Sequence, residues 1–251
     1  MNKTNVESVH LWRRAKKLLQ RRGLPDALLE VCSRIISKLT MRFCELRRCY
    51  VLCQPLSVIP RLPPHRGLSF TVRELQRTEV AILGHIRPIR EIEERFDEAS
   101  RCFVVESRGA LAGFLWLHPG AYSDPEVVVL FTPSGTQSVW DFDVYVAPEF
   151  RGGLAFYRLW SEVARALQEE SVTHSFSMVW TNNDESISSH TRLGAYPIGS
   201  IFQLRFGATR VLLYQCSFKI SDHRKSLARF LLADDVRLRG RYSRFRRANA
   251  G

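Results

Sequence analysis

The stretch VWDFDVYVAPEFRGGLAFYRLW, residues 139–160, limits the fold more than any other part of the sequence. Its first half alternates in polarity, which predicts a strand with Asp141 and Asp143 on one face and apolar side chains on the other. Two glycines follow, and the next apolar residues recur at helical spacing up to Leu167. A strand that enters a helix through a glycine turn is typical of a domain in which strands and helices alternate.

The glycine turn itself suggests a phosphate site. The first turn of a helix has unpaired backbone N–H groups and a partial positive charge, which together attract phosphate. Gly152 and Gly153 have no side chain to keep a ligand from these amides, and Arg151 adds a cation. The pattern predicts a nucleotide-like cofactor; the alternative is that the turn needs glycine for backbone reasons alone. The spacing differs from G-x-G-x-x-G and from the P-loop, which disfavours NAD and ATP sites of those kinds.

The pattern on either side of this unit predicts a mixed α/β (α+β) fold. Strands are predicted in LSFTVREL, RCFVVES, ALAGFLWLH, EVVVLF, SFSMVW, IGSIFQLRF and TRVLLYQC, with hairpins at Arg108-Gly109 and Gly207-Ala208. Short helices are predicted at 79–86, 88–99 and in DESISSHTRL, which Gly194 ends.

Basic charge is concentrated at the two ends of the chain. Residues 1–67 hold 14 Lys/Arg against 4 Asp/Glu, residues 208–251 hold 11 against 3, and residues 68–207 hold 12 against 18. We therefore expect any anionic partner, such as a membrane surface or nucleic acid, at the ends; the alternative is that these are solvated faces.

Three regions are predicted. Residues 1–67 are expected to be a basic helical extension, with one helix over 6–22, a second from Pro25 to Leu46, and a proline-rich linker ending near Gly67. Residues 68–220 are the α/β domain. Residues 221–251 are expected to form a basic amphipathic helix, RKSLARFLLADDVRL, and a disordered tail.

Several classes of protein are disfavoured. No apolar run approaches the roughly 20 residues of a membrane span, and no secretory signal is apparent. The six cysteines lack zinc spacing, so we expect no metal site and free thiols in a reducing compartment. The clustered Cys44, Cys49 and Cys53 are expected to pack as small apolar residues. The predicted location is the cytoplasm, either free or attached at the periphery of a membrane.

The order of elements over residues 68–216 resembles the core of the GNAT superfamily of acyl-CoA N-acyltransferases. The resemblance is carried by FDVYVAPEFRGG, LAFYRLWSEVARAL, SMVWTNND and SISSHTRLGAYPIG. It implies a GNAT-like mixed central sheet flanked by helices, with acetyl-CoA or another acyl-CoA as donor. In this family the loop reads Arg/Gln-x-x-Gly-x-Gly/Ala, and its amides hold the pyrophosphate of coenzyme A. The implied residues here are Arg151, Gly152, Gly153, Leu154 and Ala155, one residue shorter than the usual pattern.

The resemblance also implies roles for two residues near Gly194. In the family an asparagine faces the cofactor, and a tyrosine seven residues later protonates the leaving thiolate. The corresponding residues are Asn183 and His190. Histidine can donate a proton near neutral pH, which makes His190 a candidate acid; the alternative is a polar residue on a short helix.

The mechanism that follows is direct attack of an amine on the thioester. A carboxylate would help to deprotonate the amine, and Asp143 and Asp141 are the candidates, unless they only mark a solvent face. Backbone N–H groups around Val144, Tyr145 and Val146 would hold the oxyanion. The acceptor is an amine on a small molecule or a peptide. The alternative function is a catalytically silent GNAT-like module whose basic ends bind an anionic membrane, nucleic acid or a protein.

Overall fold

The computed structural model describes residues 24–41, 43–63, 65–124, 126–127, 129–133, 137–207, 209–214, 217–221 and 228–232. The helix predicted over 6–22 and the C-terminal tail beyond residue 232 lie outside these residues.

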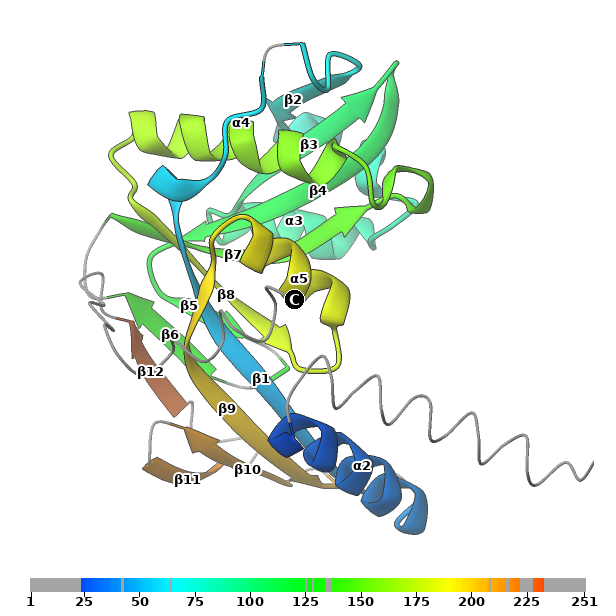
Figure 1. Ribbon diagram of the computed structural model, residues 1–251, viewed down its shortest axis with the longest axis vertical. Coiled ribbons are helices and arrows are strands. Elements are labelled where there is room, and N and C mark those ends of the chain that lie inside the picture. The colour runs from blue at the N-terminus through cyan, green and yellow to red at the C-terminus, as the bar shows by residue number, and fades with distance from the viewer. Residues whose placement is uncertain are drawn as a thin grey trace, which may run out of the picture.

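A nine-stranded mixed sheet forms the centre of the molecule (Figure 1), as the predicted α/β fold requires. In spatial order its strands are β11 (Ser217–Ser221), β10 (Thr209–Tyr214), β9 (Tyr196–Phe206), β1 (Cys44–Pro55), β8 (His174–Trp180), β7 (Ser138–Val146), β4 (Ala110–Pro119), β3 (Arg101–Ser107) and β2 (Phe70–Glu74). All described neighbours are antiparallel except β7 and β8, which are parallel.

The hairpins predicted from turn residues are confirmed. Arg108 and Gly109, between β3 and β4, have φ angles of 51° and 80°. A turn with two positive φ angles matches the right-handed twist of its flanking strands, and glycine allows the second angle without strain. The hairpin predicted at residues 207–208 joins β9 to β10.

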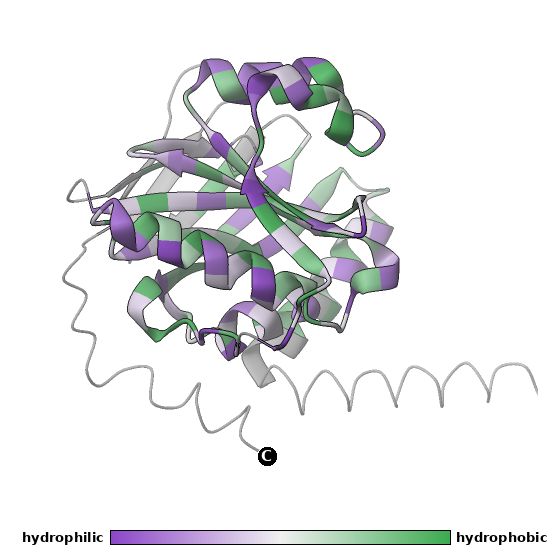
Figure 2. Cartoon of the chain, turned by 90° about the horizontal axis from the view of Figure 1, so that it is seen from above, coloured by the Kyte–Doolittle hydropathy of each residue, from purple (hydrophilic) through white to green (hydrophobic). Residues whose placement is uncertain are grey.

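Helices cover both faces of the sheet. Helix α4 (Ala155–Glu169) lies across β3 and β4 and packs Leu159, Trp160 and Val163 into the core. On the opposite face, the 3-10 helix η2 (Arg77–Leu83) and α3 (Ile89–Asp97) pack against Phe114 and Trp116. The short helix α5 (Asp184–Arg192) follows β8. Hydrophilic and hydrophobic residues alternate along the flanking helices in Figure 2, as expected for helices with one buried side.

The N-terminal region departs from its prediction. Helix α2 spans Leu24–Leu39, but the chain then turns, and Leu46 belongs to strand β1 rather than to the helix. This strand lies between β8 and β9, and Cys49–Gln54 are all buried. A strand buried on both faces reads as a continuous apolar run, so it shows no alternation that would separate it from a helix. The sheet thus begins well before Gly67.

The C-terminal region differs as well. The predicted helix RKSLARFLLADDVRL contains a strand, β12 (Ala228–Leu232), which pairs in parallel with β6 (Val129–Pro133). With β5 (Tyr122–Asp124) they form a second, three-stranded sheet. The helical prediction is wrong here because a five-residue apolar run fits either structure, and only its pairing partner decides.

Candidate functional site

The parallel strands β7 and β8 form a fork. They pair only over Ser138–Trp140 and His174–Phe176, and then separate. Beyond Trp140, β7 continues to Val146 with pairing to β4 alone among the described strands. The edge of β7 that faces the fork therefore has backbone N–H and C=O groups that pair with no described strand. Such groups can form hydrogen bonds with an extended ligand.

A β-bulge in β7 lies opposite Leu115. The β4 partners shift from Phe114, opposite Tyr145, to Trp116, opposite Phe142, so that Asp143 and Val144 face one residue. Asp143 has a φ of 45°, which is unusual for a residue other than glycine. The extra residue reverses the alternation of the strand. The expectation that Asp141 and Asp143 share a face is therefore wrong: Asp141 lies on the α4 face and Asp143 on the α3 face.

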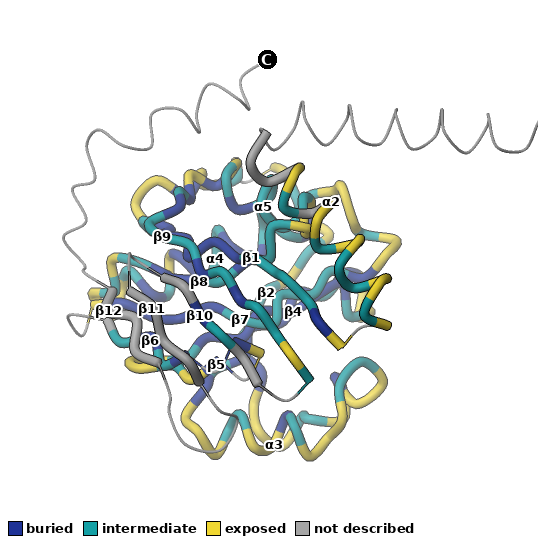
Figure 3. The backbone as a smooth tube through the Cα atoms, turned by 90° about the horizontal axis from the view of Figure 1, so that it is seen from below, coloured by how far each residue is buried: buried dark blue, intermediate teal, exposed yellow. Residues whose placement is uncertain are grey.

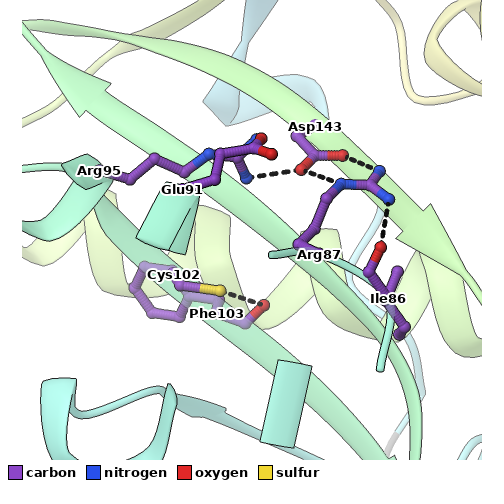
Figure 4. Close-up of polar contacts among 7 residues, drawn as sticks. All are labelled: Ile86, Arg87, Glu91, Arg95, Cys102, Phe103 and Asp143. Carbon is purple, nitrogen blue, oxygen red and sulfur yellow. Dashed lines mark hydrogen bonds and ion pairs between the residues drawn. The ribbon is translucent and has the colours of Figure 1, made fainter. Parts of the chain in front are cut away.

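Asp143 is held by two arginines from the α3 face (Figure 4). Arg87 donates to both carboxylate oxygens, with Nε 2.9 Å from Oδ2, and Arg95 Nη1 lies 2.5 Å from Oδ2. Burial alone would raise the pKa of Asp143, but the two guanidinium groups outweigh it and lower that pKa. Arg95 also stacks over Trp116 and Phe142. Asp143 is thus an ionised anchor for the bulge, and a base role would require it to exchange these partners.

Asp141 has the opposite environment. It is 2% exposed, and the Ser175 hydroxyl donates a 2.6 Å hydrogen bond to its Oδ1. Burial raises the pKa of Asp141 to about 7. Asp141 is the first β7 residue beyond the last β7–β8 pair, so this titratable carboxyl lies where the fork begins.

The glycine turn lies at the other end of the fork. Gly152 has a φ of 71°, and a Cβ added there would meet no atom within 4 Å. Glycine is therefore required by the backbone conformation, and the space in front of it is open. The turn is closed by Arg151, whose Nε donates to Val146 O at 3.0 Å. The N–H of Gly153 is bonded to Phe150 O at 3.3 Å.

The N-terminus of α4 is left available by this turn. Leu154 is the N-cap residue and has no capping side-chain hydrogen bond, and the first turn has no acidic residue. Most helices have Ser, Thr, Asp or Asn at this position. The uncapped end thus keeps both its N–H groups and its positive dipole for an anion.

Asn183 and His190 lie on α5. Asn183 is the N-cap of the helix, and its side chain accepts from the Ser186 N–H at 3.1 Å, which gives it a structural role. His190 is 2% exposed, with its ring 5.9 Å from both Phe156 and Trp160 of α4. Burial lowers the pKa of His190 to about 4, so the ring is neutral at pH 7. Its buried Nδ1 has no hydrogen-bond partner in the described part of the chain.

The structure thus brings His190 close to the first turn of α4 and places the two aspartates apart. Val144 and Val146 pack into the α4 core, while the Tyr145 ring stacks on Phe114. Sequence reasoning missed Arg87 and Arg95, which no local pattern connects to β7. It also missed Ser175, although the alternating serines of SFSMVW mark a polar face on a central strand.

Other parts of the described chain add little to this site. A cavity of about 700 Å³ lies at the far end of α4, beside residues 56–62, and includes none of the predicted site residues. Within the described residues no cluster could hold a metal, and no helix has the length and apolar character of a membrane span. Cys44, Cys49 and Cys53 are buried free thiols, as predicted for this cluster. Cys102 is also a buried free thiol, whereas Cys32 is an exposed one.

The fold and the fork define the class of protein. It is a mixed α/β domain in which a strand, a glycine turn and a helix border the gap between two parallel strands. The model of the acetyltransferase (GNAT) family matches residues 69–195, just over half of the chain. The chain therefore belongs to the GNAT family. Members of this family use acyl-CoA, and membership supports N-acetyltransferase activity in the broad sense.

Solved structures align with part of the chain. A functionally unknown conserved protein from Staphylococcus epidermidis ATCC 12228 aligns with a TM-score of 0.49 at 9% identity, over 68% of this chain and 66% of that one. For a putative GNAT acetyltransferase from Novosphingobium aromaticivorans DSM 12444 the TM-score is 0.43 at 12% identity, over 63% of each chain. Both alignments span less than two thirds of those proteins. AAC(6')-Iy, in complex with the bisubstrate analogue CoA-S-monomethyl-acetylneamine, aligns with a TM-score of 0.41 at 14% identity, over 50% of this chain and 89% of that one. No curated protein matches the chain.

Proposed function

We propose that the protein is an N-acetyltransferase that transfers an acyl group from acetyl-CoA, or another acyl-CoA, to an amine by direct attack. The observation that carries the proposal is the fork between β7 and β8, with an uncapped helix N-terminus and open glycine turn at one end. A Cβ at Gly152 would project into open space beside the helix end, so the cradle suits a pyrophosphate. When bound, acyl-CoA supplies the thioester carbon that the amine attacks and the thiolate that leaves.

The residues of the chain divide the remaining work. The backbone of Gly152, Leu154 and Ala155 binds the pyrophosphate, while the Gly153 N–H holds the turn through its bond to Phe150 O. Arg151 adds positive charge beside the pyrophosphate. Among Val144, Tyr145 and Val146, the backbone N–H groups that point into the fork rather than toward β4 stabilise the negative charge that develops on the carbonyl oxygen.

Of the two carboxyl groups, we assign proton transfer to Asp141. A general base works best when its pKa lies near the operating pH, and the pKa of Asp141 is about 7. Asp143 instead fixes the bulge through Arg87 and Arg95. His190, neutral at pH 7, can donate a hydrogen bond from its ring N–H but has no second proton to transfer.

The test is a titration of the full chain with acetyl-CoA and with coenzyme A, followed by calorimetry and by thermal shift. Free thiol released in the presence of a panel of small amines and peptide N-termini then reports transfer. We expect saturable heat and a raised Tm with both ligands. The absence of heat and of a thermal shift with every acyl-CoA would contradict the proposal and favour the catalytically silent module.

A further inference from the structure

Helix α2 and the turn after it expose a series of large apolar side chains. We call it the α2 stripe: Leu28, Val31, Ile35, Leu39, Met41 and Phe43. Leu39 is 78% exposed and Met41 93%. The first four recur three or four residues apart, so they share one side of the helix. In Figure 3 the described part of α2 carries exposed residues along its length, whereas β1 beside it is buried or intermediate.

The stripe is not the side of α2 that packs on the sheet; it is a second apolar side of the same helix. The other side of α2 is fastened to β1: the Ser33 hydroxyl donates to Leu46 O, and Leu29 and Ile36 are partly buried. Beyond the helix, Cys44 N donates to Thr40 Oγ1 at 3.0 Å. The helix is therefore held in place by one face while it turns the α2 stripe outward. Clustered exposed apolar side chains rimmed by polar residues are typical of interaction sites.

Basic residues accompany the stripe. Arg34 and Lys38 are exposed and lie three and seven residues after Val31, so they follow one flank of the stripe. The acidic residues of the helix, Asp26 and Glu30, come before Val31 in the sequence. The 23 residues that precede α2 contain seven Lys/Arg and a single acidic residue, Glu7.

We propose that the α2 stripe docks on an anionic lipid surface. An amphipathic helix with long cationic side chains beside its apolar face lies in the plane of a membrane, with its apolar residues at the boundary of the acyl chains. Arg34 and Lys38 can extend their stems along the apolar residues and place their charges at the lipid phosphates. The basic flank formed by Arg34 and Lys38 favours this occupant over an uncharged protein surface.

The experiment measures binding of the full chain to vesicles by flotation. Vesicles of phosphatidylcholine alone are compared with vesicles that also contain phosphatidylserine, across a series of salt concentrations. We expect binding to the anionic vesicles that weakens as salt rises. Ile35→Glu, which puts a charge into the stripe, should reduce the partition coefficient at least tenfold, and Lys38→Glu about fivefold or more.

The matched control is Val58→Glu, which introduces the same charge at an apolar side chain that is 53% exposed and outside the stripe. It should bind vesicles as the unchanged protein does. Equal binding to neutral and anionic vesicles, no binding to either, or equal effects of Ile35→Glu and Val58→Glu would each overturn the proposal. So would a dimer that Ile35→Glu dissociates in sedimentation velocity, since the occupant would then be a second copy. A lower Tm for Ile35→Glu than for Val58→Glu would also overturn it, because the stripe would then be covered within the chain.

Discussion

The two aspartates of β7 are separated by one residue, yet their pKa values move in opposite directions. The bulge at Asp143 sends the side chains to opposite faces of the sheet, where Asp141 meets a serine and Asp143 meets two arginines. Alternation in the sequence predicts a shared face, and nothing local in the sequence marks the extra residue. The sequence therefore identifies the two aspartates as candidate site residues, but it does not predict the surroundings of either carboxyl group.

The raised pKa of Asp141 predicts a pH-dependent stability. Because the folded state holds its proton up to about pH 7 and the unfolded chain only to about pH 4, the folded state binds more protons between these values. The contribution of Asp141 to the free energy of unfolding should therefore fall as pH rises through this window, by on the order of 4 kcal/mol, and stay level above it. Burial lowers the pKa of His190 to about 4, so the His190 contribution rises between about pH 4 and pH 6.5 and opposes that of Asp141. Asp141→Asn removes only the Asp141 contribution, so the difference in free energy between the two proteins should change by this amount across the window, with the variant the more stable at pH 8. Urea unfolding from pH 4.5 to 8.5 measures both effects.

The same substitution tests the proposed base. If Asp141 accepts the proton, kcat/KM of the unchanged enzyme should rise with pH and level off above about pH 7. Asp141→Asn should lose this rising limb of the pH profile together with most of its activity. A variant that keeps the limb would exclude Asp141 as its source. Binding of coenzyme A, measured in parallel, should persist in Asp141→Asn.

Asp143 should behave as a structural anchor. Asp143→Asn leaves Arg87 and Arg95 without a carboxylate, and we expect a loss of about 2–3 kcal/mol in the free energy of unfolding. Arg95→Met should cost less, because Arg87 still pairs with Asp143 and methionine can pack on Trp116 and Phe142. Urea titrations give both values. In the folded Asp143→Asn variant, the pH limb of kcat/KM near pH 7 should remain; its disappearance would return the base role to Asp143.

At the scale of elements, the uncapped N-terminus of α4 links stability to ligand binding, because a negative charge that stabilises this helix end should weaken anion binding there. Leu154→Asp would place a favourable negative charge at the helix dipole. Leu154 has helical dihedral angles (φ −89°, ψ −8°), which do not suit a capping side chain, so the charge alone should raise the free energy of unfolding, by about 0.5 kcal/mol. The same carboxylate would repel a pyrophosphate. We expect a higher Tm and at least tenfold weaker binding of coenzyme A, measured by thermal shift and calorimetry.

The matched control is Leu154→Asn, which has a side chain of the same size without the charge. It should leave the Tm close to that of the unchanged protein and weaken coenzyme A binding less than Leu154→Asp does. If the two variants bind coenzyme A as tightly as the unchanged protein, the pyrophosphate does not lie at this helix end.

Helices, strands and turns that are marked by nearby turn residues or by apolar periodicity were predicted correctly. The hairpin at Arg108-Gly109, the strand and helix around the glycine turn, and α5 ending before Gly194 each follow from turn residues and periodicity. Strands β1 and β12 were not predicted as strands, because their identity depends on distant partners: β8 and β9 for the first and β6 for the second. The fork could not be predicted from the sequence either, because it depends on the residue at which β7 and β8 stop pairing.

At the scale of the whole molecule, the family match and the sheet do not have the same limits. The match begins at residue 69, but β1 (Cys44–Pro55) lies inside the sheet, between β8 and β9. This strand contributes Cys49, Val51 and Cys53 to a buried cluster with Phe176 and Ile201. The N-terminal region is thus part of the folding unit of the acetyltransferase domain.

A pair of truncations tests this conclusion. A chain that begins at residue 67 loses β1, so β8 and β9 would become exposed edges and several buried apolar side chains would lose their neighbours. We expect it to aggregate or to lose cooperative unfolding, because unpaired strand edges associate and the loss of a central strand exceeds the usual 5–15 kcal/mol of stability. A chain that begins at residue 24 keeps every described strand and should unfold with a Tm within a few degrees of the full chain. Circular dichroism and calorimetry of both chains decide the matter. A soluble chain from residue 67 with an unchanged Tm would mean that β1 is dispensable, and that the boundary near Gly67 separates two independent units after all.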